Sequence, residues 1–215
     1  SKKFKIKNYK VVYVPPHTLI CPMAQMVKKT KIEVGAQNCH HQNDYGALTG
    51  SINAKMIKGV GANYVILGHS ENRQRGETDK LINLKIKTAL NNNLKVIFCI
   101  GETIKEKKNK KTNLVLSRQL KLGLQGLKFN KNLIIAYEPV WAIGSGMIPT
   151  SEDLFKTINF IKSKVKKSVK VLYGGSVNDK NITELKTINN IDGYLIGGAS
   201  QNSKKFIDII KKTYN

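Results

Sequence analysis

The chain has 215 residues, of which 40% are apolar, so it is long enough to bury a substantial core. Its 37 Lys and Arg residues against 14 Asp and Glu give a formal charge of +23, which attracts anions of any kind. The lysines recur along the whole chain, without interleaved aromatic residues or a basic tail, so we do not expect a nucleic-acid partner.

Membrane and disulfide classes are disfavoured as well. No apolar run approaches the ~20 residues of a membrane span, and the first ten residues lack the apolar region of a secretory signal. We therefore expect a cytoplasmic protein with no membrane partner. Cys21, Cys39 and Cys99 are odd in number, widely spaced and without a CxxC pair, which predicts reduced structural thiols rather than disulfides or a zinc site.

Short apolar runs alternate with amphipathic segments along the chain. The runs predict strands at residues 11–14, 32–36, 64–67, 96–100, 133–136, 169–172 and 194–196. The segments between them predict helices at residues 79–91, 113–127, 151–165, 181–188 and 203–212. This alternation indicates an α/β fold built from parallel βα units, and no linker interrupts it, so we expect a single domain over residues 1–215.

The polar residues that draw attention all follow the carboxyl ends of predicted strands. In an eight-stranded parallel barrel that face carries the active site, so the pattern favours a barrel. A doubly wound nucleotide-binding sheet would be expected to carry GxGxxG or GxxxxGK[ST], and the sequence has neither.

Glu138 ends one of the predicted strands and is followed by the apolar segment 140–143, with Gly144 and Gly146 behind it. An apolar loop bounded by glycines predicts a lid that closes over the carboxylate. Because loss of water raises the proton affinity of a carboxylate, Glu138 is a candidate general base. The alternative is a surface acid in front of an ordinary loop.

His69 follows another strand, and Ser70 after it is expected to cap a short helix. The field at a helix N-terminus disfavours the imidazolium, so a neutral histidine that donates a hydrogen bond is expected. A structural histidine is the alternative. His40 and His41 are adjacent and lack further partners in the sequence, so we expect no metal site there.

Two glycine pairs, Gly174-Gly175 and Gly197-Gly198, follow the last two strands. Glycine allows backbone N–H groups to approach an anion closely, which predicts a phosphate site. Tight turns with positive φ are the alternative explanation for each pair.

These features together indicate proton removal by Glu138 from a carbon next to a carbonyl, with His69 polarising that carbonyl and a phosphate anchoring the substrate. Trp141 and its lid would exclude water, in which an enediolate phosphate can lose its phosphate.

Several motifs in the same order carry a family resemblance. QNC with GALTGS, ILGHSENR with GETD, CIGE, YEPVWAIGSG, YGGSV and DGYLIGGAS resemble triosephosphate isomerases over nearly the whole chain, from Val11 to Ile210. The resemblance implies a TIM (β/α)8 barrel that needs no cofactor, is usually a homodimer or a larger homo-oligomer, and interconverts dihydroxyacetone phosphate and glyceraldehyde 3-phosphate in glycolysis and gluconeogenesis.

The resemblance also assigns roles to residues of this chain. Glu138 would be the base, His69 the electrophile and Glu71 a pocket carboxylate; these are the family's roles and are not worked out from this chain alone. A list of binding positions follows from the same motifs: backbone amides at Gly144, Ser176, Gly197 and Gly198 would hold the phosphate. Thr49, in the long loop 38–50, would reach the active site of a partner subunit.

One departure from the family pattern stands out. The family begins with a strand that ends in Asn-x-Lys, and no such motif precedes Val11. Only seven strands are predicted, so the first βα unit, about 30 residues, is expected to be absent. An alternative to the isomerase is therefore a weak or inactive barrel that keeps phosphate binding as a scaffold.

Overall fold

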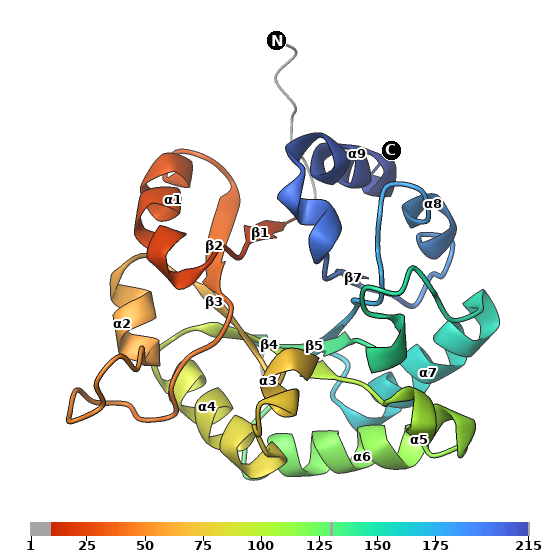
Figure 1. Cartoon of the computed structure of the whole chain (residues 1–215), viewed down its shortest axis with the longest axis horizontal. Helices are drawn as coiled ribbons and strands as arrows, with labels where there is room; N and C mark the ends of the chain where they lie inside the picture. The colour runs from red at the N-terminus through yellow and green to blue at the C-terminus, as the bar shows by residue number, and fades with distance from the viewer. Residues whose placement is uncertain (1–9, 130, 215) are drawn as a thin grey trace.

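Seven parallel strands form one curved sheet in the computed structural model, which describes residues 10–129 and 131–214 (Figure 1). Each strand pairs with its neighbours in chain order, from β1 to β7. Their bounds are β1 Val11–Tyr13, β2 Ile32–Ala36, β3 Tyr64–Leu67, β4 Lys95–Ile100, β5 Leu133–Tyr137, β6 Lys170–Tyr173 and β7 Gly193–Tyr194. The predicted strands are confirmed, and the largest shift is at β7, which ends at Tyr194.

Helices surround the outer face of this sheet (Figure 1). They are α1 Ile20–Val27, α2 Ala54–Gly59, α4 Asp79–Asn91, α6 Thr112–Gly123, α7 Ser151–Lys164, α8 Ile182–Leu185 and α9 Ser203–Tyr214. Shorter turns follow the strands: α3 Ser70–Gln74, α5 Ile104–Lys108, and the 3-10 turns η1 His17–Leu19, η2 Val140–Ala142 and η3 Gly198–Gln201. None of the helices in the described part of the chain is long and apolar enough to cross a membrane.

Side-chain caps fix where the best predicted helices begin. Thr78 accepts a hydrogen bond from the Leu81 N–H at the start of α4, and Thr150 accepts one from the Asp153 N–H at the start of α7. The helices α1, α2 and α5 were not predicted. They are short, and in α1 only Ile20 is buried, so they carry little of the periodic apolar pattern on which helix prediction depends.

The two faces of the strands bury different sets of side chains. Alternate residues such as Val65, Val96 and Phe98 pack outward against the helices in the main core. Tyr64 and Ile97 belong to a second, smaller cluster, which the alternation places on the inner face of the curved sheet. The inner cluster is less completely covered, because several apolar side chains packed against it are only half-buried: Val12, Ile66, Ile134, Leu172 and Leu195.

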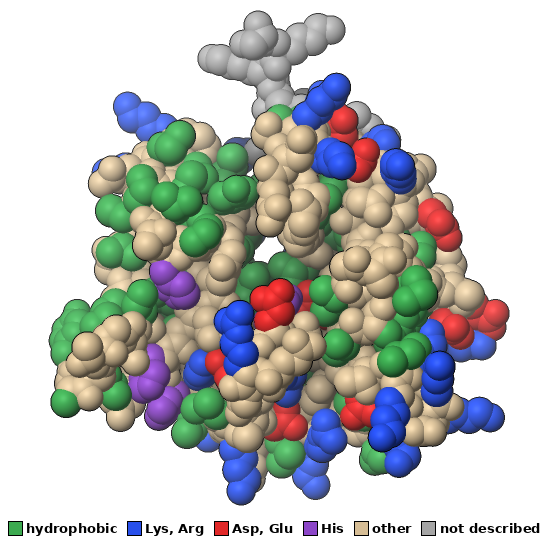
Figure 2. Space-filling model, in the orientation of Figure 1, with side chains coloured by type: hydrophobic (Ala, Val, Ile, Leu, Met, Phe, Trp, Pro, Cys, Tyr) green, Lys and Arg blue, Asp and Glu red, His purple; other side chains and the backbone are tan. Residues whose placement is uncertain are grey.

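A cavity of about 1530 Å³ fills the space inside the curve of the sheet. It is lined from the amino ends of the strands, at Lys10 and Lys95, to their carboxyl ends, at His69 and Gly197. Over the described residues β1 and β7 do not pair with each other, and Figure 2 shows the hollow at the centre of this face. The sheet is thus the wall of a barrel that does not close on itself within the part of the chain described.

Candidate active site

Glu138 lies directly after β5, with its side chain turned into the barrel mouth and only 5% of the residue exposed. Its backbone N–H donates to the Ile100 carbonyl at 2.8 Å, which extends the strand pairing by one residue. Burial raises the pKa of Glu138 above its usual value, although His69 and the Cys99 thiol oppose the shift. Its Oε2 is buried and has no hydrogen-bond partner among the described residues, so the carboxylate is not fully engaged by the protein.

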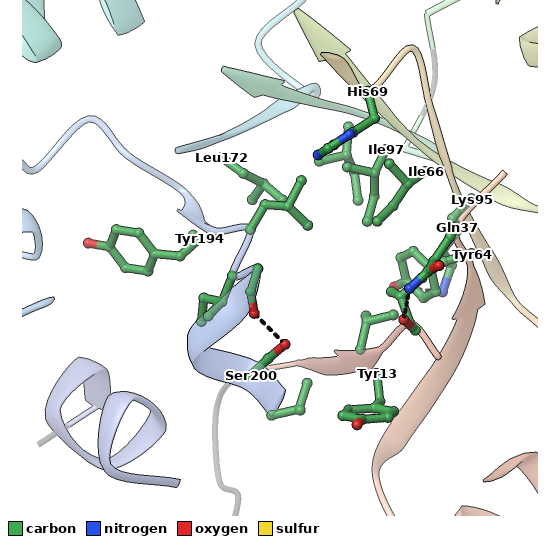
Figure 3. Close-up of a pocket in the computed structure, with 18 of the residues that line it drawn as sticks. Tyr13, Gln37, Tyr64, Ile66, His69, Lys95, Ile97, Leu172, Tyr194 and Ser200 are labelled. Atoms are coloured by element: carbon green, nitrogen blue, oxygen red, sulfur yellow. Dashed lines mark hydrogen bonds between the residues drawn. The ribbon is translucent and has the colours of Figure 1, made fainter. Parts of the chain in front are cut away.

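His69 lies after β3 and faces Glu138 at the same mouth. Its Nε2 is 3.7 Å from Oε1 of Glu138. Its Nδ1 accepts a hydrogen bond from the Glu71 backbone N–H at 3.4 Å, so a neutral imidazole carries its proton on Nε2. Figure 3 shows the imidazole pointing into the pocket. The geometry supplies a hydrogen-bond donor directed at the cavity, next to a carboxylate.

The expected cap at Ser70 was wrong. His69 itself occupies the N-cap of α3, and Ser70 is the first residue of the helix and is buried. The sequence favoured serine because its hydroxyl is a common capping group. In the fold, Nδ1 of His69 accepts the capping hydrogen bond instead. The same hydrogen bond caps the helix and orients the imidazole.

The predicted lid is a 3-10 turn, η2, that rests on a buried carboxylate. Trp141 Nε1 donates to Glu102 Oε1 at 2.9 Å, and the hydroxyl of Tyr137 donates to the same carboxylate at 3.2 Å. Glu102 is 1% exposed, and burial raises its pKa. The sequence placed Glu102 after a strand but assigned it no role, because its contact with Trp141 spans 39 residues.

The far end of the lid is fastened to Ser176. The hydroxyl of Ser176 donates to the Ala142 carbonyl and accepts from the Gly146 N–H at 3.2 Å. Gly144 and Gly146 have φ of +67° and +76°, a conformation that favours glycine. The lid is therefore held at both ends, and its two glycines provide the turn between them.

The first glycine pair is explained by the protein's own packing. None of the four paired glycines has a positive φ, so the tight-turn alternative is not supported. A Cβ on Gly174 would lie 2.7 Å from Glu138 Cγ, and one on Gly175 would lie 2.4 Å from the Tyr173 hydroxyl. Glycine at Gly174 and Gly175 thus makes room for Glu138 and Tyr173.

The second glycine pair is not explained in that way. A Cβ on Gly197 or Gly198 would meet no atom within 4 Å. Their backbone N–H groups have no acceptor among the residues that the structure describes, and the same holds for Gly144 and Ser176. The four N–H groups are therefore free to bind an anion.

The predicted site residues lie in three places. Glu138, His69, Glu71, Gly197 and Gly198 line one cavity, in which η3 with Ser200 lies opposite His69 (Figure 3). Gly144 and Ser176 do not line this cavity but are joined to it through the lid. Thr49 lies apart, exposed on the loop between β2 and α2. No cluster of His, Cys, Asp or Glu suited to a metal ion occurs within residues 10–129 and 131–214.

Comparisons with known proteins extend this description. A family model described as triosephosphate isomerase matches residues 1–213. A triosephosphate isomerase of Chlorobium luteolum is 43% identical over 206 residues, which cover 92% of this chain and 82% of that protein. A triosephosphate isomerase of Dictyoglomus thermophilum is 41% identical over 222 residues, which cover 98% of this chain and 88% of that protein. The crystal structure of triosephosphate isomerase from Bartonella henselae superimposes with a TM-score of 0.90 at 35% identity, covering 97% of this chain and 88% of that one.

Proposed function

The chain belongs to the triosephosphate isomerase family and is an isomerase of glycolysis and gluconeogenesis, and we propose that it moves the substrate proton with Glu138 and His69. The substrates are dihydroxyacetone phosphate and glyceraldehyde 3-phosphate, interconverted through an enediolate. The observation that carries the assignment of residues is the free Oε2 of a buried Glu138, beside the Nε2 of His69 at 3.7 Å from its Oε1.

Glu138 acts as the base because its environment makes the carboxylate a better proton acceptor. Its burial raises the pKa towards the working pH, so proton transfer from a carbon acid becomes less unfavourable. Its carboxylate removes the proton from the carbon next to the carbonyl. After the proton has been transferred, the same carboxylate returns it to the neighbouring carbon. The hydroxyl proton of that carbon moves to the former carbonyl oxygen by way of His69 Nε2, which gives its own proton to one oxygen and takes one from the other, and the isomerisation is then complete.

His69 stabilises the negative charge that develops on the substrate oxygen. With Nδ1 occupied by the Glu71 N–H, its Nε2–H is directed into the cavity and donates to the carbonyl oxygen. Glu71 thereby orients His69 through its backbone, while its exposed carboxylate lies at the rim of the same mouth.

The phosphate is held by backbone N–H groups and the reaction is covered by the lid. Gly197 and Gly198 line the cavity and provide two free N–H groups, to which Gly144 and Ser176 add two more from the lid side. Trp141, tied to Glu102, keeps the lid closed and water out, which protects the enediolate from loss of its phosphate.

Replacement of the base tests this assignment. Glu138→Gln keeps the shape of the side chain but cannot accept the proton, so kcat is expected to fall about 100- to 10,000-fold in a coupled dehydrogenase assay. Glu152→Gln, at the exposed start of α7 and not among the residues that line the cavity, is the control for loss of one carboxylate. If the parent chain bound inorganic phosphate but gave no isomerisation, the scaffold alternative would replace the proposal.

A homodimer in the cytoplasm is also proposed. The exposed apolar residues Met26, at 76%, and Tyr45, at 65%, lie on α1 and on the loop that carries Thr49, and Figure 2 shows hydrophobic side chains gathered over this side. A patch of this kind favours association with a second copy. Thr49→Arg is expected to shift the sedimentation coefficient towards the monomer, whereas Asn113→Arg on the exposed face of α6 is not.

A further inference from the structure

Among the residues that the structure describes, five lysines and arginines line the cavity, and four of them lie at the amino ends of strands. They are Lys10, directly before β1, Lys95 and Lys170, the first residues of β4 and β6, and Lys131, just before β5. Lys10 and Lys95 are also engaged by Glu33, at 3.1 and 3.2 Å. These four charges lie at the end of the barrel opposite to Glu138 and His69.

Arg75 is the fifth cation and lies at the carboxyl end. It directly follows α3, which begins at His69, and its backbone N–H donates to the Glu71 carbonyl at 3.2 Å. Arg75 is therefore one helical turn beyond Glu71 on the same face, and both line the cavity. Side chains of a helix lean towards its N-terminus, so the exposed Arg75 side chain is expected to extend back along α3 towards His69.

Arg75 offsets the negative charge of the carboxylates at this mouth. Glu71 and Glu138 both line it, so without Arg75 its carboxylates would repel a phosphate ester despite the formal charge of +23 on the whole chain. The Arg75 side chain makes no hydrogen bond or ion pair with any residue in the described part of the chain.

We propose that Arg75 is a substrate-binding residue whose guanidinium attracts the phosphorylated substrate from the His69 side of the carboxyl mouth, while the N–H groups of Gly197 and Gly198 hold the phosphate from the opposite side. This inference rests on the proposed function, since it takes the substrate to be a phosphate dianion. A guanidinium offers paired N–H donors that match phosphate oxygens. The phosphate carries its charge before and during the reaction, so the contact strengthens ground state and transition state alike and acts mainly on KM.

Kinetics of matched charge variants of the whole chain test the proposal. Arg75→Ala is expected to lower kcat/KM for glyceraldehyde 3-phosphate about 10- to 100-fold, chiefly through KM, as fits the loss of a charged hydrogen bond. Lys131→Ala removes the same charge from the other end of the same cavity and is expected to stay within about twofold of the parent. Added guanidinium ion is expected to restore part of the Arg75→Ala activity and none of that of Glu138→Gln.

Calorimetric binding of inorganic phosphate separates this inference from the function itself. Weaker phosphate binding by Arg75→Ala than by Lys131→Ala supports the role of Arg75 even if no isomerisation is detected, in which case the proposed function alone fails. Equal phosphate affinity and equal KM in the two variants would overturn the inference while leaving Glu138 and His69 as they stand. A fall in kcat together with a lowered Tm, without guanidinium rescue, would also overturn it, because it indicates a structural role.

Discussion

The middle of the sheet and its β7 edge differ in how many residues pair and how fully the strands are buried. β4 and β5 pair over five residues and are almost wholly buried, whereas β6 and β7 pair over two, and both residues of β7 are half-buried. Glu138 and Glu102 follow β5 and β4, and His69 follows the neighbouring β3, while the turn that we propose to bind phosphate follows β7. The proposed proton-transfer groups thus follow the well-paired, buried strands, and the proposed anion-binding turn follows the short, half-buried edge strand.

Truncation of buried side chains is expected to show the largest difference in stability between the middle of the sheet and its edge. Phe98→Ala empties a fully buried site in β4 and is expected to lower the free energy of unfolding by about 3–5 kcal/mol. Tyr194→Ala removes a half-buried ring from β7 and is expected to cost less than half as much. Urea denaturation measures both. Equal losses would mean that the edge is as well packed as the middle.

A methyl group added at Gly174, next to Glu138, is expected to have the next largest effect. Gly174→Ala would place a Cβ 2.7 Å from Glu138 Cγ, so the carboxylate must move, and a misplacement of about 1 Å costs roughly 100-fold in kcat. Gly198→Ala on the loose edge meets no neighbour and is expected to change KM for the substrate by only a few-fold. Steady-state kinetics that showed the reverse order would contradict the proposed division of roles.

The lid contact is expected to matter less than the base. Trp141→Phe keeps the apolar ring but removes the Nε1–H that donates to Glu102, so kcat is expected to fall about tenfold as closure weakens. Tyr137→Phe removes the other donor to Glu102 without touching the lid and is the matched control. A comparable loss of kcat in Tyr137→Phe would show that the effect comes from the Glu102 carboxylate itself, rather than from its hydrogen bond with Trp141.

The pH dependence of stability gives the smallest effect. Burial raises the folded-state pKa of Glu138, so its protonation stabilises the fold fully below the unfolded value of about 4.3, and this contribution is lost as pH rises through the folded pKa. Gln does not titrate, so the stability of Glu138→Gln relative to the parent is expected to increase with pH over that window. Urea unfolding at several pH values would contradict this if the difference were constant or decreased.

Much of the site was predictable because its residues occupy strand ends. The parallel βα pattern placed Glu138 and His69 at one mouth, and the structure brings them together as that pattern required. Three contacts were not predicted: the hydrogen bond from Trp141 to Glu102, the hydrogen bonds of Ser176 with the lid, and the cap formed by His69. Each depends on a contact between segments or on a ring orientation that no local pattern encodes.

The sequence by itself determined the order of strands and helices, the side of the sheet that carries the chemistry, and the residue types available there. These follow from periodicity and from the rule that parallel strands align their carboxyl ends. Only the tertiary structure decided which glycines make room for protein atoms and which leave N–H groups free, and which of the cavity's cations line its carboxyl end. Those are matters of distance between segments far apart in the chain, and such distances are fixed by packing alone.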